Sequence, residues 1–135
     1  MGRILAIDYG KKRVGLAVTD PLKISSRILP FQEKTKLRDW LLLFFKTEDV
    51  ETVVIGYPEH KDGSLMDLTI DIDSLLEFIQ KIDSNTVIKR SEESFTSKEA
   101  MSLMIRAGVG KKKRREKGLI DSYSALVILE DYLRK

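Results

Sequence analysis

The chain has 135 residues, of which 42% are hydrophobic and 33% are charged. This apolar content excludes an intrinsically disordered chain, and the length suits one domain with a single hydrophobic core. The longest apolar run, residues 40–45, is far shorter than the roughly 20 residues that cross a bilayer. We therefore expect a single domain over residues 1–135, located in the cytoplasm, with no membrane span and no signal peptide.

Cysteine is absent from the sequence, and His60 is its one histidine. Disulfides, cysteine nucleophiles, cysteine-ligated metals and sites that need two histidines are therefore excluded. A Ser-His-Asp triad would have to use His60, which we predict to lie in a solvated loop. Carboxylates are the groups that remain for catalysis.

The net charge of +3 is concentrated in one short segment. Residues 111–117 carry a net charge of +5, so the rest of the chain carries −2. Such a run is often only a solvated loop, but a flexible basic loop also suits contact with nucleic-acid phosphates. Its candidate phosphate contacts are Lys111, Lys112, Lys113, Arg114, Arg115 and Lys117. A second basic cluster, Lys11, Lys12 and Arg13, lies far away in the sequence.

The pattern of apolar residues predicts alternating strands and helices. The apolar run 3–8 predicts a strand covered on both faces at the centre of a sheet, and residues 13–19 predict its hairpin partner. Residues 28–31 predict an edge strand, where Pro30 is tolerated. The remaining predictions are a helix over 37–45, a strand at 52–56, a helix over 65–79, a strand from 87, a helix from 96 and a helix over 119–133. This order predicts an α/β fold with a mixed five-stranded sheet, in which an antiparallel hairpin is followed by parallel strands and helices flank both faces.

Three acidic residues lie beside apolar segments, where burying a charged side chain costs free energy. Asp8 ends the most apolar strand, although a carboxylate there could simply cap a turn. Asp121 shares a helix face with small and apolar residues, although the helix dipole also favours an acid in a first turn. Glu93 follows the last predicted strand, and its neighbour Glu92 is an alternative because the register is not fixed.

Convergence of Asp8, Asp121 and one of these glutamates would place three negative charges in a partly buried site. Two like charges about 4 Å apart repel by about 4 kcal/mol at an effective dielectric constant near 20. The cluster would therefore need raised pKa values or a bound cation. Oxygen ligands around open positions select Mg²⁺ or Mn²⁺.

Several segments resemble the motifs of one known family. Residues 7–20, IDYGKKRVGLAVTD, closely resemble the opening signature of the YqgF family, also called RuvX, in the RNase H-like superfamily. Residues 56–64 are similar to its second motif, and residues 120–133 are similar to its C-terminal motif. Its third motif corresponds to residues 92–97, which puts Glu93 on the family's acidic position. The resemblance spans nearly the whole chain.

The resemblance implies an RNase H-like fold and a nuclease in which Asp8, Glu93 and Asp121 hold one or two Mg²⁺ or Mn²⁺ ions. The roles proposed for the family are maturation of the 5′ end of 16S ribosomal RNA and resolution of Holliday junctions. The basic residues would position the nucleic-acid backbone, and ribosomal or processing proteins are candidate partners. We expect a monomer or a weak homodimer, since a resolvase needs a two-fold dimer whereas trimming an RNA end does not.

The chain departs from the family pattern at Ser94, where the family carries arginine. If that arginine contacts a phosphate, its loss weakens substrate binding and leaves metal binding intact, and Arg90 or Lys89 could replace it. Two other functions stay open at this point. One is a non-catalytic nucleic-acid-binding domain of the same fold. The other is a sugar-kinase-like domain, because residues 8–15 also resemble a phosphate loop, although such enzymes close two domains around a nucleotide.

Overall fold

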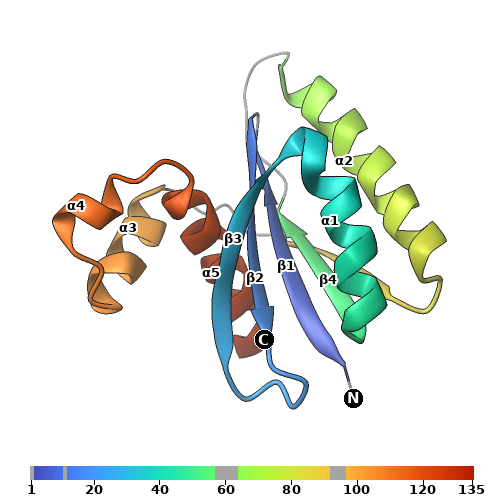
Figure 1. Ribbon diagram of the computed structural model, residues 1–135, viewed down its shortest axis with the longest axis horizontal. Coiled ribbons are helices and arrows are strands. Elements are labelled where there is room, and N and C mark those ends of the chain that lie inside the picture. Colours follow the sequence, from blue (N-terminus) through green and yellow to red (C-terminus); the bar gives the residue numbers. More distant parts are fainter. Residues whose placement is uncertain (1, 11, 57–63, 92–96) are drawn as a thin grey trace.

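The computed structural model describes residues 2–10, 12–56, 64–91 and 97–135, which form a mixed five-stranded sheet with helices on both faces (Figure 1). The strands are β1 (Arg3–Tyr9), β2 (Arg13–Thr19), β3 (Ser26–Glu33), β4 (Val50–Gly56) and β5 (Val87–Ser91). The helices are α1 (Lys34–Thr47), α2 (Ser64–Ile82), α3 (Ser97–Arg106), α4 (Lys111–Arg114) and α5 (Leu119–Arg134).

The strand order is β3-β2-β1-β4-β5, which places the most apolar strand at the centre of the sheet. β1 pairs antiparallel with β2 and parallel with β4, β2 pairs antiparallel with β3, and β4 pairs parallel with β5. The predicted mixed sheet, the central β1 and the edge position of β3 are therefore confirmed. In β3, Pro30 lies at a register irregularity, where a ladder tolerates a missing N–H group.

Two hydrophobic cores lie on opposite faces of the sheet. Leu5 and Ile7 of β1 pack in the core under α1 and α2. Ile4 and Ala6 of the same strand pack in the core under α3 and α5. Figure 1 shows these helix pairs on the two sides of the sheet. The alternation of side chains along β1 thus places successive apolar residues of the strand in opposite cores.

The basic segment contains a helix that the sequence analysis did not predict. Residues 111–117 were expected to form a flexible loop, and this is wrong for the first four of them, which form α4. Lysine and arginine are good helix formers, whereas the mutual repulsion of their charges favours a loop. Here the Arg114 side chain donates a hydrogen bond to the Val109 carbonyl oxygen at 3.0 Å, which ties the helix to the preceding chain.

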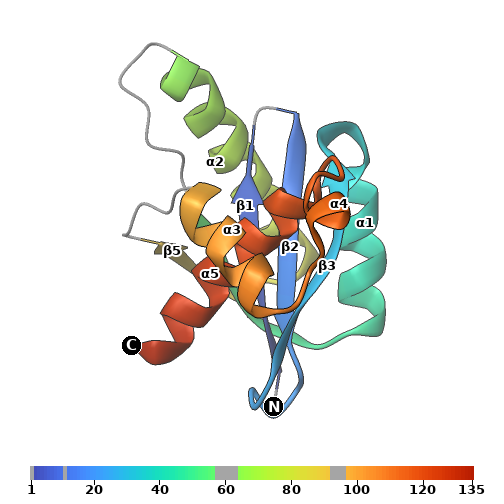
Figure 2. The ribbon, with the colours of Figure 1, turned by 90° about the vertical axis from the view of Figure 1, so that its left-hand side faces the viewer.

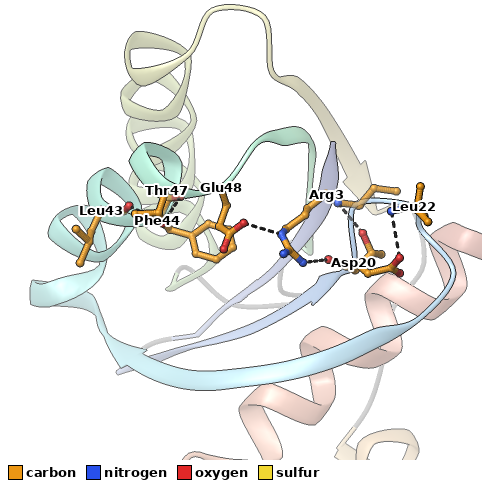
Figure 3. A network of polar contacts seen from close by, with 9 residues as sticks. Arg3, Asp20, Leu22, Leu43, Phe44, Thr47 and Glu48 are labelled. Carbon is orange, nitrogen blue, oxygen red and sulfur yellow. Dashed lines mark hydrogen bonds and ion pairs between the residues drawn. The ribbon is translucent and has the colours of Figure 1, made fainter. Parts of the chain in front are cut away.

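A network of polar contacts lies at the end of the sheet where β1 begins. The Arg3 guanidinium donates to the Glu48 carboxylate at 2.9 Å and to the Thr19 carbonyl oxygen at 3.0 Å (Figure 3). Asp20 accepts hydrogen bonds from the backbone N–H groups of Leu22 and Ser25 in the turn between β2 and β3. These contacts join α1, β1 and the β2–β3 turn far from the other end of β1, where Asp8 lies. Within the described parts of the chain, no helix has both the length and the apolar character needed to span a membrane.

Candidate active site

Asp8 lies near the end of β1, on the sheet face that α5 covers. Its side chain alternates in phase with Ala6, which belongs to the core under α5. The pairing register places Gly15 of β2 on one side of Asp8 and Gly56 of β4 on the other, and Ser91 of β5 pairs with Gly56. We call this set, Gly15, Asp8, Gly56 and Ser91, the Asp8 row. Asp8 is thus flanked on both sides by residues that have no side chain.

The two glycines of the Asp8 row allow α5 to approach the sheet closely. A Cβ atom at Gly15 would collide with the backbone carbonyl group of Asp121. A Cβ atom at Gly56 would meet the end of the Ile128 side chain. Glycine inside a strand commonly marks such a close approach of backbone. The first turn of α5 therefore rests on the sheet beside Asp8 (Figure 2).

Asp121 lies in this first turn of α5, and two contacts position it. The Arg13 Nε atom donates to the Asp121 Oδ2 atom at 3.0 Å, and both side chains are about a quarter exposed. The buried hydroxyl of Ser122 donates to the Leu29 carbonyl oxygen at 2.8 Å, which fastens the same turn to β3. Gly118 precedes the helix with a positive φ of 89°, a conformation that favours glycine. The turn that carries Asp121 is thus held against both β2 and β3.

Asp8 and Asp121 interact electrostatically. Burial and, to a smaller extent, the negative charge of Asp121 together raise the pKa of Asp8 from 3.8 to about 6. Two carboxylates that repel each other in a partly buried place can share a proton or bind a cation between them. Their oxygen atoms are the ligands that Mg²⁺ and Mn²⁺ prefer. The donor set of the site therefore fits the expected metal ions.

The third predicted carboxylate lies outside the described residues. This holds for Glu93 and its neighbour Glu92, and also for Lys11, His60 and Ser94. Within the described ranges, no group of three acidic or histidine side chains is placed to hold a metal ion. The structure thus brings together two of the three predicted metal ligands. In sequence, Glu93 follows two positions after Ser91, the β5 member of the Asp8 row.

Most of the predicted basic contacts are exposed and lie on the α5 side of the sheet. α4 lies beyond α5 together with α3 (Figures 1 and 2). The exposed basic side chains are Lys12, Lys111, Lys112, Lys113, Arg115 and Lys117. Arg114 is less exposed because it binds the Val109 carbonyl oxygen, and Arg13 is paired with Asp121. Of the predicted phosphate contacts that the structure describes, Arg13 and Arg114 therefore also have structural contacts, and the others are exposed on the surface.

A small hollow with basic residues adjoins the Asp8 row at its β5 end. Its volume is about 200 Å³, and its lining includes Lys89, Ser91, Tyr132 and Lys135. Lys89 pairs in register with Val54, which belongs to the core under α5, so Lys89 points to the same face as Asp8. Lys135 is partly neutralised by Asp131, whose Oδ2 atom lies 3.3 Å from its Nζ atom. Lys89, named above as a possible replacement for the missing arginine, therefore lies on the same sheet face as Asp8.

Sequence reasoning missed three features that shape this site. It treated Arg13 only as a phosphate contact, although Arg13 also pairs with Asp121. It assigned no role to Ser122, and it did not anticipate that Gly15 makes room for the α5 backbone. The available signals were a glycine within an apolar strand and a serine directly after the acid of the C-terminal motif.

Known proteins resemble this chain over nearly its whole length. The family model described as "RuvX: Holliday junction resolvase" matches residues 2–135. The chain belongs to the RuvX family. A protein of Christiangramia forsetii named "Putative pre-16S rRNA nuclease" is 42% identical over 134 residues, which are 98% of each chain. A protein of Flavobacterium johnsoniae with the same name is 41% identical and covers 98% of this chain and 96% of its own.

Two solved structures share the fold of this RuvX-family chain. The T. thermophilus RuvC in complex with a Holliday junction substrate has a TM-score of 0.62 and 18% identity, and the match covers 99% of this chain and 96% of RuvC. The fowlpox virus Holliday junction resolvase has a TM-score of 0.59 and 11% identity, with 98% and 97% of the two chains covered. At these identities the likeness establishes the fold alone, which confirms the expected RNase H-like architecture.

Proposed function

We propose that this RuvX-family protein is a divalent-metal-dependent nuclease that hydrolyses a phosphodiester bond at the 5′ end of precursor 16S ribosomal RNA. The observation that carries the proposal is that the first turn of α5, which carries Asp121, packs beside Asp8 on one face of the sheet, on the same side as the exposed cations of residues 111–117. The choice of RNA is supported by the names of relatives that align over nearly the full chain. Ribosomal or processing proteins remain candidate partners.

Asp8, Asp121 and Glu93 are the residues that would hold Mg²⁺ or Mn²⁺. Burial and the charge of Asp121 both raise the pKa of Asp8, and a cation shared by the two carboxylates would relieve the repulsion between them. When bound, the metal supplies an activated water molecule and stabilises negative charge on the leaving oxygen. No cysteine or histidine ligand is required, which agrees with a sequence that has no cysteine and one histidine.

The other residues of the site orient the ligands and the substrate. Arg13 fixes the Asp121 carboxylate, and Ser122 fixes the turn that carries it. Lys12 and the exposed cations of residues 111–117 neutralise phosphates on the α5 side of the sheet and bind without sequence specificity. The hollow beside Lys89 accepts a phosphate next to the bond that is cut, which compensates for the serine at position 94.

The test is cleavage of two labelled substrates in Mg²⁺ or Mn²⁺. One is a single-stranded RNA that carries the 5′ end of the 16S precursor, and the other is a four-way DNA junction. The wild type is compared with Asp8→Asn and with Asp49→Asn, the same chemical change at an exposed position outside the site. We expect RNA cleavage by the wild type and by Asp49→Asn. We expect Asp8→Asn to lose cleavage and to retain most of its RNA binding.

A second function is junction resolution, which the description of the family model favours. Cleavage of the junction in place of the RNA, lost in Asp8→Asn, would establish it. RNA cleavage retained at the wild-type rate in Asp8→Asn would refute the assignment of the site. If both substrates are bound and neither is cut, the protein is a nucleic-acid-binding domain of the same fold and the nuclease proposal is wrong.

A further inference from the structure

Helix α1 presents an outward face that is not used by the fold or by the candidate active site. Leu41 of this helix is fully buried against the sheet. The opposite face consists of Asp39, Leu42, Leu43 and Lys46, which lie close together because they are spaced three or four residues apart. We call these four residues the α1 outer face. Leu42 is 47% exposed and Leu43 is 64% exposed, so the centre of this face is apolar and open to solvent.

The α1 outer face borders a hollow of about 620 Å³ that also has Phe45 and Ile82 in its lining. Exposed apolar side chains that gather around a hollow mark interaction surfaces more often than isolated ones do. The charges at the two ends of the face can pair with charges of a partner molecule, because neither Asp39 nor Lys46 takes part in an ion pair among the described residues.

The order of the four residues is self-complementary. Asp39 and Lys46 are equally far from the midpoint between Leu42 and Leu43. Two α1 helices that pack antiparallel around a two-fold axis at this midpoint would therefore place Asp39 opposite the partner's Lys46, and Leu42 opposite the partner's Leu43. Symmetry forms each contact twice, as in any isologous interface.

We propose that the α1 outer face binds a second copy of this chain and forms a weak two-fold dimer. The self-complementary charges favour a second copy over an unrelated partner. A helix face with one acidic end and one basic end is complementary in charge to an antiparallel copy of itself. α1 and α5 cover opposite faces of the sheet (Figure 1), so this dimer leaves both Asp8 rows facing away from the interface. The proposal is therefore independent of the proposed nuclease function.

Analytical ultracentrifugation over a concentration series tests this pairing. Asp39→Lys and Lys46→Asp each turn two attractive contacts per dimer into two repulsive ones. We expect the dissociation constant of the dimer formed by each variant alone to exceed that of the wild type by about tenfold or more. An equimolar mixture of the two variants should form a heterodimer of wild-type strength, because both charged pairs are then restored. Leu43→Glu should abolish the dimer, since it introduces charge at the apolar centre.

Lys98→Asp is the matched control, because it reverses the charge of an exposed lysine on α3, on the other side of the sheet. It should dimerise like the wild type, and circular dichroism should show that all variants are folded. A wild type that stays monomeric throughout the series overturns the proposal and leaves the face to another partner. A dimer that survives Leu43→Glu, or a mixture that stays as monomeric as its components, also overturns it. Nuclease activity should be the same in every variant.

Discussion

The charges of the two carboxylates in the candidate site are balanced in different ways. Asp121 has a cation beside it, since the Arg13 Nε atom lies 3.0 Å from its Oδ2 atom. Among the described residues, Asp8 has no such partner, and burial and the charge of Asp121 raise its pKa to about 6. In the absence of metal, the ionised form of Asp8 therefore destabilises the folded protein.

Asp8→Asn should stabilise the metal-free protein above about pH 6. The folded pKa of about 6 exceeds the ordinary value of 3.8, so the folded state binds the proton more tightly and loses stability as the pH rises between these values. The gain from Asp8→Asn should be on the order of 2–3 kcal/mol near pH 8 and should vanish at about pH 2, well below the ordinary value of 3.8, where Asp8 is protonated in both states. Urea unfolding with a chelator at several pH values measures this difference.

Asp49→Asn serves as the control for this measurement because Asp49 is exposed. Its free energy of unfolding should follow that of the wild type at every pH. Equal stability of Asp8→Asn and the wild type across the whole pH range would contradict the raised pKa. It would show that Asp8 ionises in the folded protein as easily as in the unfolded chain.

The contact between α5 and β2 determines where Asp121 lies. The helix can rest on the strand because position 15 has no side chain, and the register of β2 against β3 is irregular between Val14 and Leu16. Such irregularities occur next to active sites, where they redirect a segment of backbone. The position of the helix that carries Asp121 thus depends on a glycine in another element.

Gly15→Ala should weaken both the fold and the nuclease. The added methyl group collides with the Asp121 carbonyl group, so α5 must move away from the sheet. Overpacking of this kind costs about 1–3 kcal/mol of unfolding free energy. The rate of cleavage should fall by more than the loss of unfolding free energy explains, because Asp121 moves relative to Asp8. Urea unfolding and single-turnover cleavage measure the two effects.

Gly110→Ala is the matched control, because a Cβ atom at Gly110 would meet no atom within 4 Å and the φ of Gly110 is −68°. Its stability should stay within about 0.5 kcal/mol of the wild type. If Gly15→Ala also stays within that range and cleaves normally, α5 does not depend on close contact with β2.

The charge of the protein is distributed unevenly between its two faces. Residues 111–117 carry +5 although the whole chain carries only +3. This segment lies beyond α5, on the side of the sheet that holds the Asp8 row (Figure 2). A nucleic acid drawn by this charge would therefore meet the face on which Asp8 and Asp121 lie.

Neutralising cations on that face should reduce the salt dependence of RNA binding. In the Lys112→Gln, Lys113→Gln double variant, the slope of log affinity against log salt should fall by about 0.7 for each phosphate contact that is lost. The control is Lys36→Gln with Lys81→Gln, which removes two exposed lysines from α1 and α2 on the other face. Fluorescence anisotropy over a salt series gives both slopes. Equal slopes for the two double variants would place the RNA elsewhere.

The spacing of apolar residues was enough to predict the order of elements, because burial repeats locally along strands and helices. It predicted β1 at the centre and β3 at an edge from the apolar run 3–8 and from Pro30. It missed α4, since a run of like charges resembles a loop when its contact with Val109 is unknown. It also gave β3 as residues 28–31, shorter than the observed Ser26–Glu33, because exposed side chains at an edge carry little pattern.

The carboxylates of the candidate site were predicted from residue types, because a chain without cysteine and with one histidine leaves carboxylates as candidate ligands. The contacts that position those carboxylates could not be predicted in this way, because they join residues far apart in the chain. Arg13 and Asp121 are separated by 108 residues, and Ser122 and Leu29 by 93. Local patterns extend over one element, whereas the pairing of Arg13, the need for glycine at position 15 and the raised pKa of Asp8 arise only where α5 packs on the sheet.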